Sequence, residues 1–184
     1  MNQIKSLGEV PYAGIPTLET TRLRLRPYKV SDLNDMEAMW SDTDYVRFIG
    51  NRVRTRPDLW KQIQSQIGSW ALLGYGYWII ERKDGAFIGE AGFLEGLREM
   101  SPNHIGTPEA GWGITPAHWG KGYATEALGA IHEWSDAHLA GKRTVCIIEP
   151  EHAASLHLAQ KQGYRLLYQA ELGEAPINIL ERNG

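Results

Sequence analysis

The 184-residue sequence contains a single cysteine, no long hydrophobic run and no strong excess of charge of either sign. The single cysteine, Cys146, excludes a disulfide within the chain, and its apolar neighbours in "TVCII" favour a small buried core residue. No stretch reaches the length of a membrane span, and the first residues lack the apolar segment of a signal peptide. We therefore expect a reducing, cytoplasmic setting and no membrane association.

The charge balance also bounds the partners. The formal net charge is -3 at pH 7, so no electrostatic argument favours binding to nucleic acid. Hydrophobic residues make up 42% and charged residues 22% of the chain, which is typical of a globular protein. A chain of this length forms one domain with a substantial core. We expect residues 1–17 to be an N-terminal arm and residues 18–184 to form a single domain.

The first half of the domain shows a strand pattern followed by two helix patterns. "TRLRLRPY" alternates leucine with arginine, which predicts a half-buried strand that ends at Pro27. Ser31 then predicts the N-cap of a helix. Its expected inward face is Leu33, Met36, Glu37 and Trp40. Pro57 opens a second helix that runs to about residue 72 and ends at glycines. The inward face of this helix is expected to be Leu59, Ile63, Ile67 and Trp70.

The second half begins with a hairpin, in which "YWIIE" and "AFIGEAGFL" flank a turn at Lys83–Gly85. "EAGWGIT" follows as a short strand, and its Gly111 and Gly113 indicate either a bulge or a close backbone approach. A helix ending at Gly141, the strand "RTVCIIE", the helix "HAASLHLAQKQ" closed by Gly163 and a final hairpin complete the chain. This order predicts a mixed α/β (α+β) fold with a mostly antiparallel sheet.

The stretch "HWGKGYATEAL", residues 118–128, places two glycines and a lysine immediately before an amphipathic helix. A helix N-terminus exposes unpaired amides and the positive end of the helix dipole, so it is a ready site for an anion. Glycines allow close approach to that backbone, Lys121 adds a charge, and Thr125 adds a hydroxyl. On this segment alone, anion binding and a turn that only redirects the chain are equally supported.

Two common nucleotide-binding patterns are absent from the sequence. No stretch has the spacing of a Walker A loop, and both "GKGYAT" and "GWGITP" lack the last glycine of the dinucleotide fingerprint. A metal site is not expected either. "HEWSD" lacks the second histidine of H-E-x-x-H, and His152 and His157 are five residues apart, on different helical faces.

"AGWGITPAHWGKGYATEAL" and "IIEPEHAASLHLAQKQGYRLL" resemble the GCN5-related N-acetyltransferase (GNAT) superfamily. The closer match is its RimJ/RimL-like branch, whose members acetylate protein N-termini or small amines. "LETTRLRLRPYKVSDL" and "GAFIGEAGF" match the same branch, so the resemblance covers residues 18–183. It implies the GNAT fold, with a mostly antiparallel central sheet of about six or seven strands, about four flanking helices and a splay between strands 4 and 5. It also implies acetyl-CoA as co-substrate and no metal.

The resemblance further implies a place for each part of acetyl-CoA. The pyrophosphate would lie on the backbone amides of the glycine turn and the first helical residues, and the pantetheine would pair with the preceding strand. His152 stands where the family often has a pantetheine-binding asparagine, and Trp119 stands where the superfamily has Gln or Arg. The implied cofactor-binding residues are Trp112, Gly113, Ile114, Trp119, Gly120, Lys121, Gly122, Tyr123, Ala124, Thr125 and His152.

The implied chemistry is direct attack of an amine on the thioester, which needs a base, an oxyanion donor and a proton for the thiolate. Ser155 matches a serine of the branch and is the candidate to hydrogen-bond the thiolate, whereas Ala159 stands where many members have a tyrosine acid. Glu109 is the first candidate base and Glu90 the second. Each reads equally well as a solvated carboxylate at a strand edge. A backbone amide within residues 112–114 would stabilise the oxyanion.

The acceptor would carry an amine, either on a protein N-terminus or on a small molecule. We expect its pocket between the helices of residues 31–72 and the closing hairpin. Candidate lining residues are Tyr45, Phe48, Trp78 and Phe93, although aromatics at such positions are more often core. The departures at His152 and Ala159 leave an alternative open, a catalytically degenerate member of the fold that binds an acyl-CoA or a metabolite without turnover. The protein is expected to be a monomer or a homodimer.

Overall fold

The structure is a computed structural model that describes residues 14–98, 104–139, 143–173 and 175–184. Most of the expected N-terminal arm lies outside these residues, as does Gly141, the expected end of a helix. The described end of the arm contacts the core, because the Pro16 carbonyl accepts a 2.8 Å hydrogen bond from the Trp78 indole.

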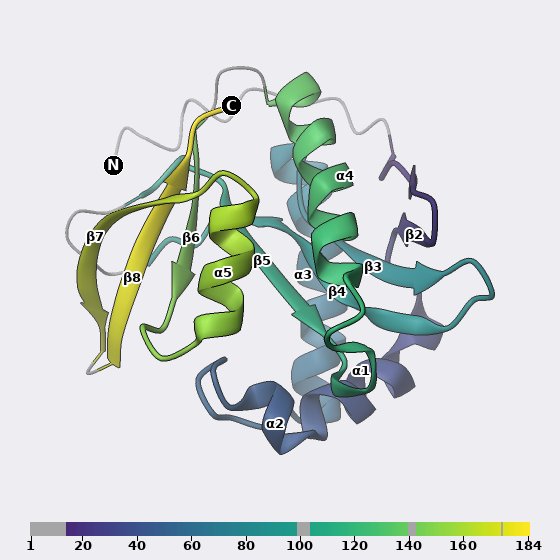
Figure 1. Cartoon of the computed structure of the whole chain (residues 1–184). Coiled ribbons are helices and arrows are strands. Elements are labelled where there is room, and N and C mark those ends of the chain that lie inside the picture. The colour runs from purple at the N-terminus through teal and green to yellow at the C-terminus, as the bar shows by residue number, and fades with distance from the viewer. Residues whose placement is uncertain (1–13, 99–103, 140–142, 174) are drawn as a thin grey trace.

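An eight-stranded sheet runs through the centre of the molecule in the order β1-β2-β3-β4-β5-β6-β8-β7 (Figure 1). The strands are β1 Leu18–Glu19, β2 Leu23–Arg26, β3 Tyr77–Arg82, β4 Phe87–Leu94, β5 Glu109–Ile114, β6 Thr144–Ile148, β7 Arg165–Leu172 and β8 Ala175–Arg182. Every neighbouring pair is antiparallel except β5 and β6, which are parallel. The predicted mixed, mostly antiparallel sheet is confirmed. It has eight strands, including the two-residue β1, where about six or seven were expected.

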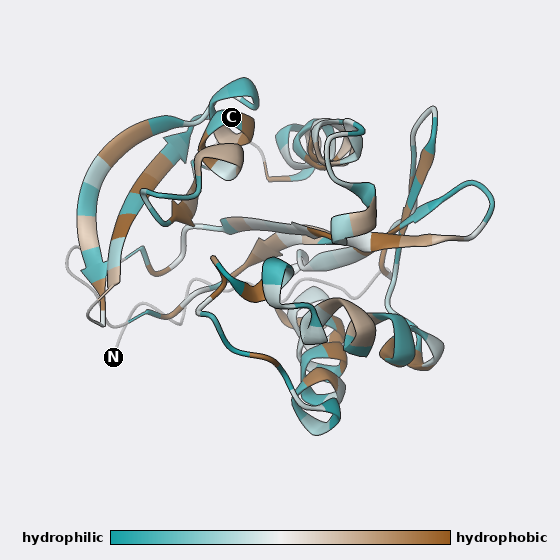
Figure 2. Ribbon diagram, turned by 60° about the horizontal axis from the view of Figure 1, so that its bottom comes forward, coloured by the Kyte–Doolittle hydropathy of each residue, from teal (hydrophilic) through white to brown (hydrophobic). Residues whose placement is uncertain are grey.

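Helices cover both faces of the sheet, with α4 and α5 on one side and α1 to α3 on the other (Figure 2). The helices are α1 Leu33–Ser41, α2 Thr43–Val46, α3 Arg56–Leu73, α4 Tyr123–His138 and α5 Ala153–Lys161, with short 3-10 helices at Val30–Asp32 and Pro116–His118. Successive residues of a strand point to opposite faces. Ile80 accordingly packs with Leu128 of α4, whereas Ile79 packs with Met36 and Leu59 of the other layer.

The first two helices differ from the sequence prediction in their details. Ser31 is not an N-cap, because a 3-10 turn precedes α1 and the Asp32 carboxylate accepts the Lys29 amide at 2.7 Å. Met39, not Glu37, completes the buried face of α1. Ile67, predicted to face inward, is 39% exposed, since the face of α3 that packs on the sheet is narrower than the periodicity suggested.

The glycines of β5 make room for tyrosines rather than marking a bulge, since the register between β4 and β5 is continuous. A Cβ placed on Gly111 would lie 1.8 Å from the Tyr77 hydroxyl oxygen, and one on Gly113 would lie 2.0 Å from that of Tyr45. The predicted bulge is therefore wrong, and the groups that come close to these glycines are tyrosine side chains.

Strands β5 and β6 diverge almost as soon as they meet. Glu109 and Val145 form their one registered pair, and the Val145 amide donates to the Pro108 carbonyl at 3.0 Å. Beyond this point the edge of β5 is open toward β6 and α5 (Figure 1). The predicted splay is thus present, and it creates the place where a ligand can enter the sheet.

Candidate active site

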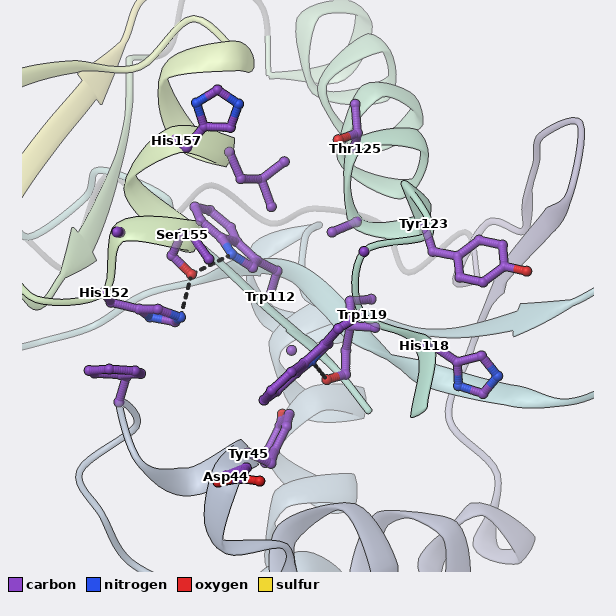
Figure 3. A pocket seen from close by; sticks show the side chains of 18 of the residues that line it. Asp44, Tyr45, Trp112, His118, Trp119, Tyr123, Thr125, His152, Ser155 and His157 are labelled. Carbon is purple, nitrogen blue, oxygen red and sulfur yellow. Dashed lines mark hydrogen bonds between the residues drawn. The ribbon is translucent and has the colours of Figure 1, made fainter. Parts of the chain in front are cut away.

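Two adjoining cavities open at this splay. The first cavity, of about 650 Å³, lies between the C-terminal end of β5, the start of α4 and α5 (Figure 3). The second cavity, of about 510 Å³, lies between α1, α3 and strands β3 to β5. The residues that line both cavities are Tyr45, Phe48, Ile49, Trp112, Gly113, His152 and Ser155. We call this shared region the junction. Both volumes are within the range of small-molecule sites.

The turn before α4 presents backbone amides to the first cavity. Gly120 and Gly122 have φ angles of 70° and 78°, a left-handed conformation that glycine adopts without strain. The Gly122 N-cap carries no side chain, and the first bond of the helix runs from the Glu126 amide to the Gly122 carbonyl at 3.1 Å. The amides of the first turn, residues 123–125, therefore have no acceptor inside the helix. This turn has the form of an anion seat.

Two of the residues predicted in this turn have their polar groups engaged elsewhere. The Lys121 ammonium donates to the Ala117 carbonyl at 2.9 Å, and Lys121 does not line the first cavity. The Trp119 amide donates to the Pro116 carbonyl at 3.1 Å. The Trp119 ring does line the first cavity, and its indole N–H donates to the Ile114 carbonyl at 2.6 Å.

The N–H and C=O groups of β5 point alternately toward β4 and toward β6. The Thr115 amide donates to the Ile88 carbonyl at 2.9 Å, so it points toward β4. Because N–H and C=O groups alternate in direction along a strand, the polar backbone groups of Gly113 also point toward β4. Those of Trp112 and Ile114 then point into the splay. Of the three residues predicted in this strand, Gly113 therefore has no amide that faces the splay. Its lack of a side chain leaves room beside the strand.

A chain of side-chain contacts crosses the junction. The Trp112 indole donates to the Ser155 hydroxyl oxygen at 3.2 Å, and the same oxygen lies 3.2 Å from Nε2 of His152 (Figure 3). The His152 ring stacks on Phe48, with ring centroids 4.4 Å apart. Burial lowers the pKa of His152, which favours the neutral imidazole. Since the Ser155 oxygen accepts from the indole, its own proton is available for donation.

Glu109 is not the solvated carboxylate that one interpretation of the sequence allowed. It is 8% exposed and forms a bidentate pair with Arg98, whose Nε and Nη2 donate to its two oxygens at 2.8 and 2.6 Å. Both residues line the second cavity. A bidentate pair of this kind engages both carboxylate oxygens with one cation.

Glu90 is also buried and also lines the second cavity. Its carboxylate accepts the Tyr28 hydroxyl at 2.8 Å and the Gln62 side-chain amide at 2.8 and 3.0 Å. Burial raises the pKa of Glu90, and these two hydrogen bonds oppose that effect without overcoming it. Glu90 is therefore a buried carboxylate with an increased affinity for a proton.

The second cavity has other walls than the sequence suggested. No described residue of the closing hairpin, β7 and β8, which was expected to help form the acceptor pocket, lines this cavity. Tyr45 and Phe48 line both cavities as expected, whereas Trp78 and Phe93 are fully buried core residues. Among the lining residues that sequence reasoning missed are Trp40, Arg54, Lys61, Gln62, Gln66 and Arg98. A polar stripe on α3 beside its apolar face, at positions 61, 62, 65 and 66, was the available indication.

The described residues contain no group of three or more histidine, cysteine, aspartate or glutamate side chains arranged to hold a metal ion. None of the helices among the described residues is long and apolar enough to cross a membrane.

Comparisons with known proteins give the chain its relatives. The family model described as "Acetyltransferase (GNAT) domain" matches residues 22–165. An uncharacterized N-acetyltransferase, p20 of Bacillus licheniformis, is 27% identical over 164 residues, which cover 85% of this chain and 89% of the relative. A putative GnaT-family acetyltransferase from Bordetella pertussis superposes with a TM-score of 0.81 at 29% identity, over 91% of this chain and 99% of the other.

The fold is also shared with a more distant enzyme. RimL, a ribosomal L7/L12 alpha-N-protein acetyltransferase solved in complex with coenzyme A, has a TM-score of 0.73 at 16% identity. The superposition covers 91% of this chain and 98% of RimL, and at this identity it shows the common fold alone.

Proposed function

The chain belongs to the acetyltransferase (GNAT) domain family and is an acyltransferase, and on this premise we propose that it moves an acetyl group from acetyl-CoA to the amine of an acceptor. One observation carries the proposal: a cavity with an anion seat and a second cavity with buried carboxylates meet at Ser155. A bisubstrate reaction needs two such compartments that share the reacting atoms.

The first cavity would hold acetyl-CoA. Its pyrophosphate would accept hydrogen bonds from the amides of Gly120 and of residues 122–125, at the positive end of α4. Its pantetheine would lie along β5 and pair with the backbone groups of Trp112 and the amide of Ile114, which face the splay, whereas the Ile114 carbonyl already accepts the Trp119 indole. This places the thioester at the junction, beside Ser155 and His152.

The second cavity would hold the acceptor. A neutral amine nitrogen there attacks the thioester carbonyl carbon, the new C–N bond forms, and the C–S bond then breaks. A backbone amide of β5 that faces the splay stabilises the oxyanion, and the Ser155 hydroxyl donates to the departing thiolate. The neutral His152 orients that hydroxyl.

The amine must lose a proton, and we assign its removal to Glu90. The Glu109 carboxylate, the first candidate from the sequence, is paired with the cationic Arg98, whereas the Glu90 carboxylate accepts only from the neutral groups of Tyr28 and Gln62. The Glu90 carboxylate faces the same cavity with its pKa raised by burial. A base whose pKa lies nearer the working pH is the more effective general base. Acceptors with an N-terminal type of amine, of pKa about 7.7–8, need less help than lysine-like amines of pKa about 10.4.

Two measurements test the proposal. Isothermal titration calorimetry should show that coenzyme A binds, and a thiol-release assay should show acetyl-CoA consumption that depends on an added amine. The assay panel should include amino acids, peptide N-termini, polyamines and aminoglycosides. Absence of coenzyme A binding would overturn the whole proposal. Binding without thiol release on any amine would instead leave a binding module, and acetyl transfer would be rejected.

A further inference from the structure

The second cavity contains an arginine that forms no salt bridge with a carboxylate of the described residues, although its charge acts on Glu90 through space. Arg54 lies in the loop between α2 and α3 and lines this cavity. Arg98, another arginine of this cavity, forms an ion pair with Glu109. Arg54 forms no ion pair with any described residue. An arginine without a salt bridge in a cavity is available for an anionic group of a ligand.

The Arg54 side chain is held in place by the protein itself. Its guanidinium carbon lies 3.8 Å from the centroid of the Trp40 ring, in a cation–π contact. The guanidinium also donates to the side-chain oxygen of Gln62, and the amide nitrogen of Gln62 donates to Glu90. The chain Arg54–Gln62–Glu90 thus connects the loop to the buried carboxylate. Because these contacts exist without a ligand, little side-chain entropy is lost when a ligand binds.

The other charged groups that face the second cavity form no salt bridge with Arg54. Arg98 and Glu109 neutralise each other. Asp58 accepts the Thr55 amide and hydroxyl at 3.1 and 2.8 Å, and its ion-pair partner, at 3.6 Å, is Arg52. Lys61 lines the cavity one helical turn from the start of α3 and forms no ion pair within the described residues. Two cations, Arg54 and Lys61, thus face the carboxylates of Glu90 and Asp58, but neither cation forms a salt bridge within the described residues.

This arrangement selects among amines. An acceptor with several amino groups would place a second positive charge against Arg54 and Lys61, at a cost in affinity. An acceptor that carries a carboxylate beside its amine would neutralise them, and a guanidinium binds a carboxylate with two parallel hydrogen bonds. The amine of such an acceptor would then point toward Glu90 and the junction.

On the basis of the proposed function, we propose that the acceptor is a small molecule with a carboxylate next to its primary amine, as in an amino acid, and that Arg54 binds this carboxylate with help from Lys61. The deep part of the second cavity then serves the amine, and its loop side serves the acid. Arg54 is a specificity-determining residue in this scheme, and the acetyl transfer itself does not need it.

The test uses matched acceptors, each an amino acid and its carboxamide, with spermidine as an amine without an anion. Thiol release from acetyl-CoA gives kcat and KM for each. We expect the acids to exceed their carboxamides in kcat/KM by about tenfold or more, the value of a charged hydrogen bond. The ionisation of the amine opposes this result, because a neighbouring carboxylate raises the pKa of an amine and a carboxamide does not. The preference can therefore only come from recognition.

The variant Arg54→Gln should raise KM for the acids about tenfold while kcat changes little, and it should abolish the preference over carboxamides. Arg54→Lys should keep part of the preference, since it retains the charge without the planar fork. Arg165→Gln is the control, because Arg165 is an exposed arginine of β7 that lines neither cavity. It should behave as the unmodified protein.

The outcomes separate this inference from the proposed function. Equal or better turnover of carboxamides or spermidine would overturn the inference and leave acetyl transfer intact. If no amine supports turnover, calorimetry of an amino acid with the coenzyme A-loaded protein decides: binding that Arg54→Gln abolishes supports the inference, and absence of binding overturns it. A preference for acids that survives in Arg54→Gln would also contradict it.

Discussion

The Trp112 indole donates a 3.2 Å hydrogen bond to the Ser155 hydroxyl, and so connects β5 to α5 across the splay of the sheet. The same hydroxyl lies 3.2 Å from Nε2 of His152. Ser155 is therefore fixed by residues from two elements at the place where the two cavities meet. Its position suits a donor to the leaving thiolate, and it also suits a purely structural role in holding Trp112.

Replacing Ser155 by alanine distinguishes these roles. We expect Ser155→Ala to lower kcat by about tenfold to a hundredfold, with a smaller change in KM for acetyl-CoA, because the donor acts on charge that develops in the transition state. Trp112→Phe is the matched variant, since it keeps an aromatic ring and removes only the indole donor. If Trp112→Phe lowers kcat as much as Ser155→Ala does, the serine acts through Trp112 and not on the thiolate.

A carboxylate at Gly122 should abolish binding of coenzyme A. An aspartate at this position brings a carboxylate beside the amides assigned to the pyrophosphate, repels the phosphate charge, and strains a backbone φ of 78° that favours glycine. We expect Gly122→Asp to weaken binding by at least about a hundredfold in calorimetry, the value of two or more lost charged hydrogen bonds.

The control for this variant is Gly129→Asp, which places the same charge on the exposed side of α4. Nothing lies within 4 Å of a Cβ at Gly129. It should leave the affinity nearly unchanged, and equal loss of affinity in both variants would exclude the assigned anion seat. Circular dichroism of both proteins checks that α4 is formed.

The two carboxylates of the second cavity should separate in their pH dependence. A base acts when deprotonated, so kcat/KM should fall as pH falls through the pKa of Glu90, which burial places above the ordinary value for glutamate. Glu90→Gln should lower kcat/KM about a hundredfold and remove the part of the acid limb that belongs to Glu90, while the fall caused by protonation of the acceptor amine stays. Glu109→Gln should have the smaller effect and keep the limb. The reverse result would return the base role to Glu109.

The sequence predicted the two cavities to very different degrees. The first cavity depends on residues 112–125, where a strand, a glycine turn and a helix start follow one another along the chain, so a local pattern exposes it. The second cavity is assembled from Trp40, Arg54, Gln62 and Glu90, which belong to a helix, a loop, another helix and a strand. Their proximity arises only from tertiary packing, and no spacing along the chain encodes it.

The same contrast holds for the fold. Strand β2 and the hairpin of β3 and β4 were predicted because alternation and turn residues are local properties. The four-residue α2 was missed, since it is too short to show a helical period. The N-cap at Ser31 was wrongly assigned because Ser31 lies inside a 3-10 turn that begins after Lys29, and the Asp32 carboxylate closes that turn by accepting the Lys29 amide.

A methyl group at Gly111 should destabilise the protein, and the substitution Tyr77→Phe should restore most of the lost stability. The Tyr77 hydroxyl oxygen would lie 1.8 Å from the new Cβ, and the next atom, the ring carbon that bears it, would lie at 3.0 Å. We expect Gly111→Ala to cost about 1–3 kcal/mol of unfolding free energy, as overpacking does. Adding Tyr77→Phe should recover most of this cost, measured by urea unfolding. If the losses of unfolding free energy caused by Gly111→Ala and Tyr77→Phe simply add in the double variant, the close contact between Gly111 and the Tyr77 hydroxyl is contradicted.

His132 should make stability depend on pH. It is buried in α4, where Nδ1 lies 3.2 Å from the Gln162 side-chain oxygen and Nε2 lies 3.2 Å from the Tyr164 hydroxyl. These contacts suit a neutral imidazole that donates from Nδ1 and accepts at Nε2. Burial lowers the pKa of His132 from 6.5 to about 4. The folded protein therefore takes up the His132 proton at a lower pH than the unfolded chain does.

The sign of the effect follows from that difference. Between pH 6.5 and about 4, the unfolded chain holds a proton on His132 that the folded protein lacks, so the unfolding free energy falls as pH falls through this range. The loss should total about 3 kcal/mol, and His132→Gln should remove it. His138→Gln, at an exposed position of the same helix, serves as control. Urea unfolding at several pH values measures the slope, and parallel profiles for the unmodified protein and His132→Gln would show that His132 is not held neutral by the fold.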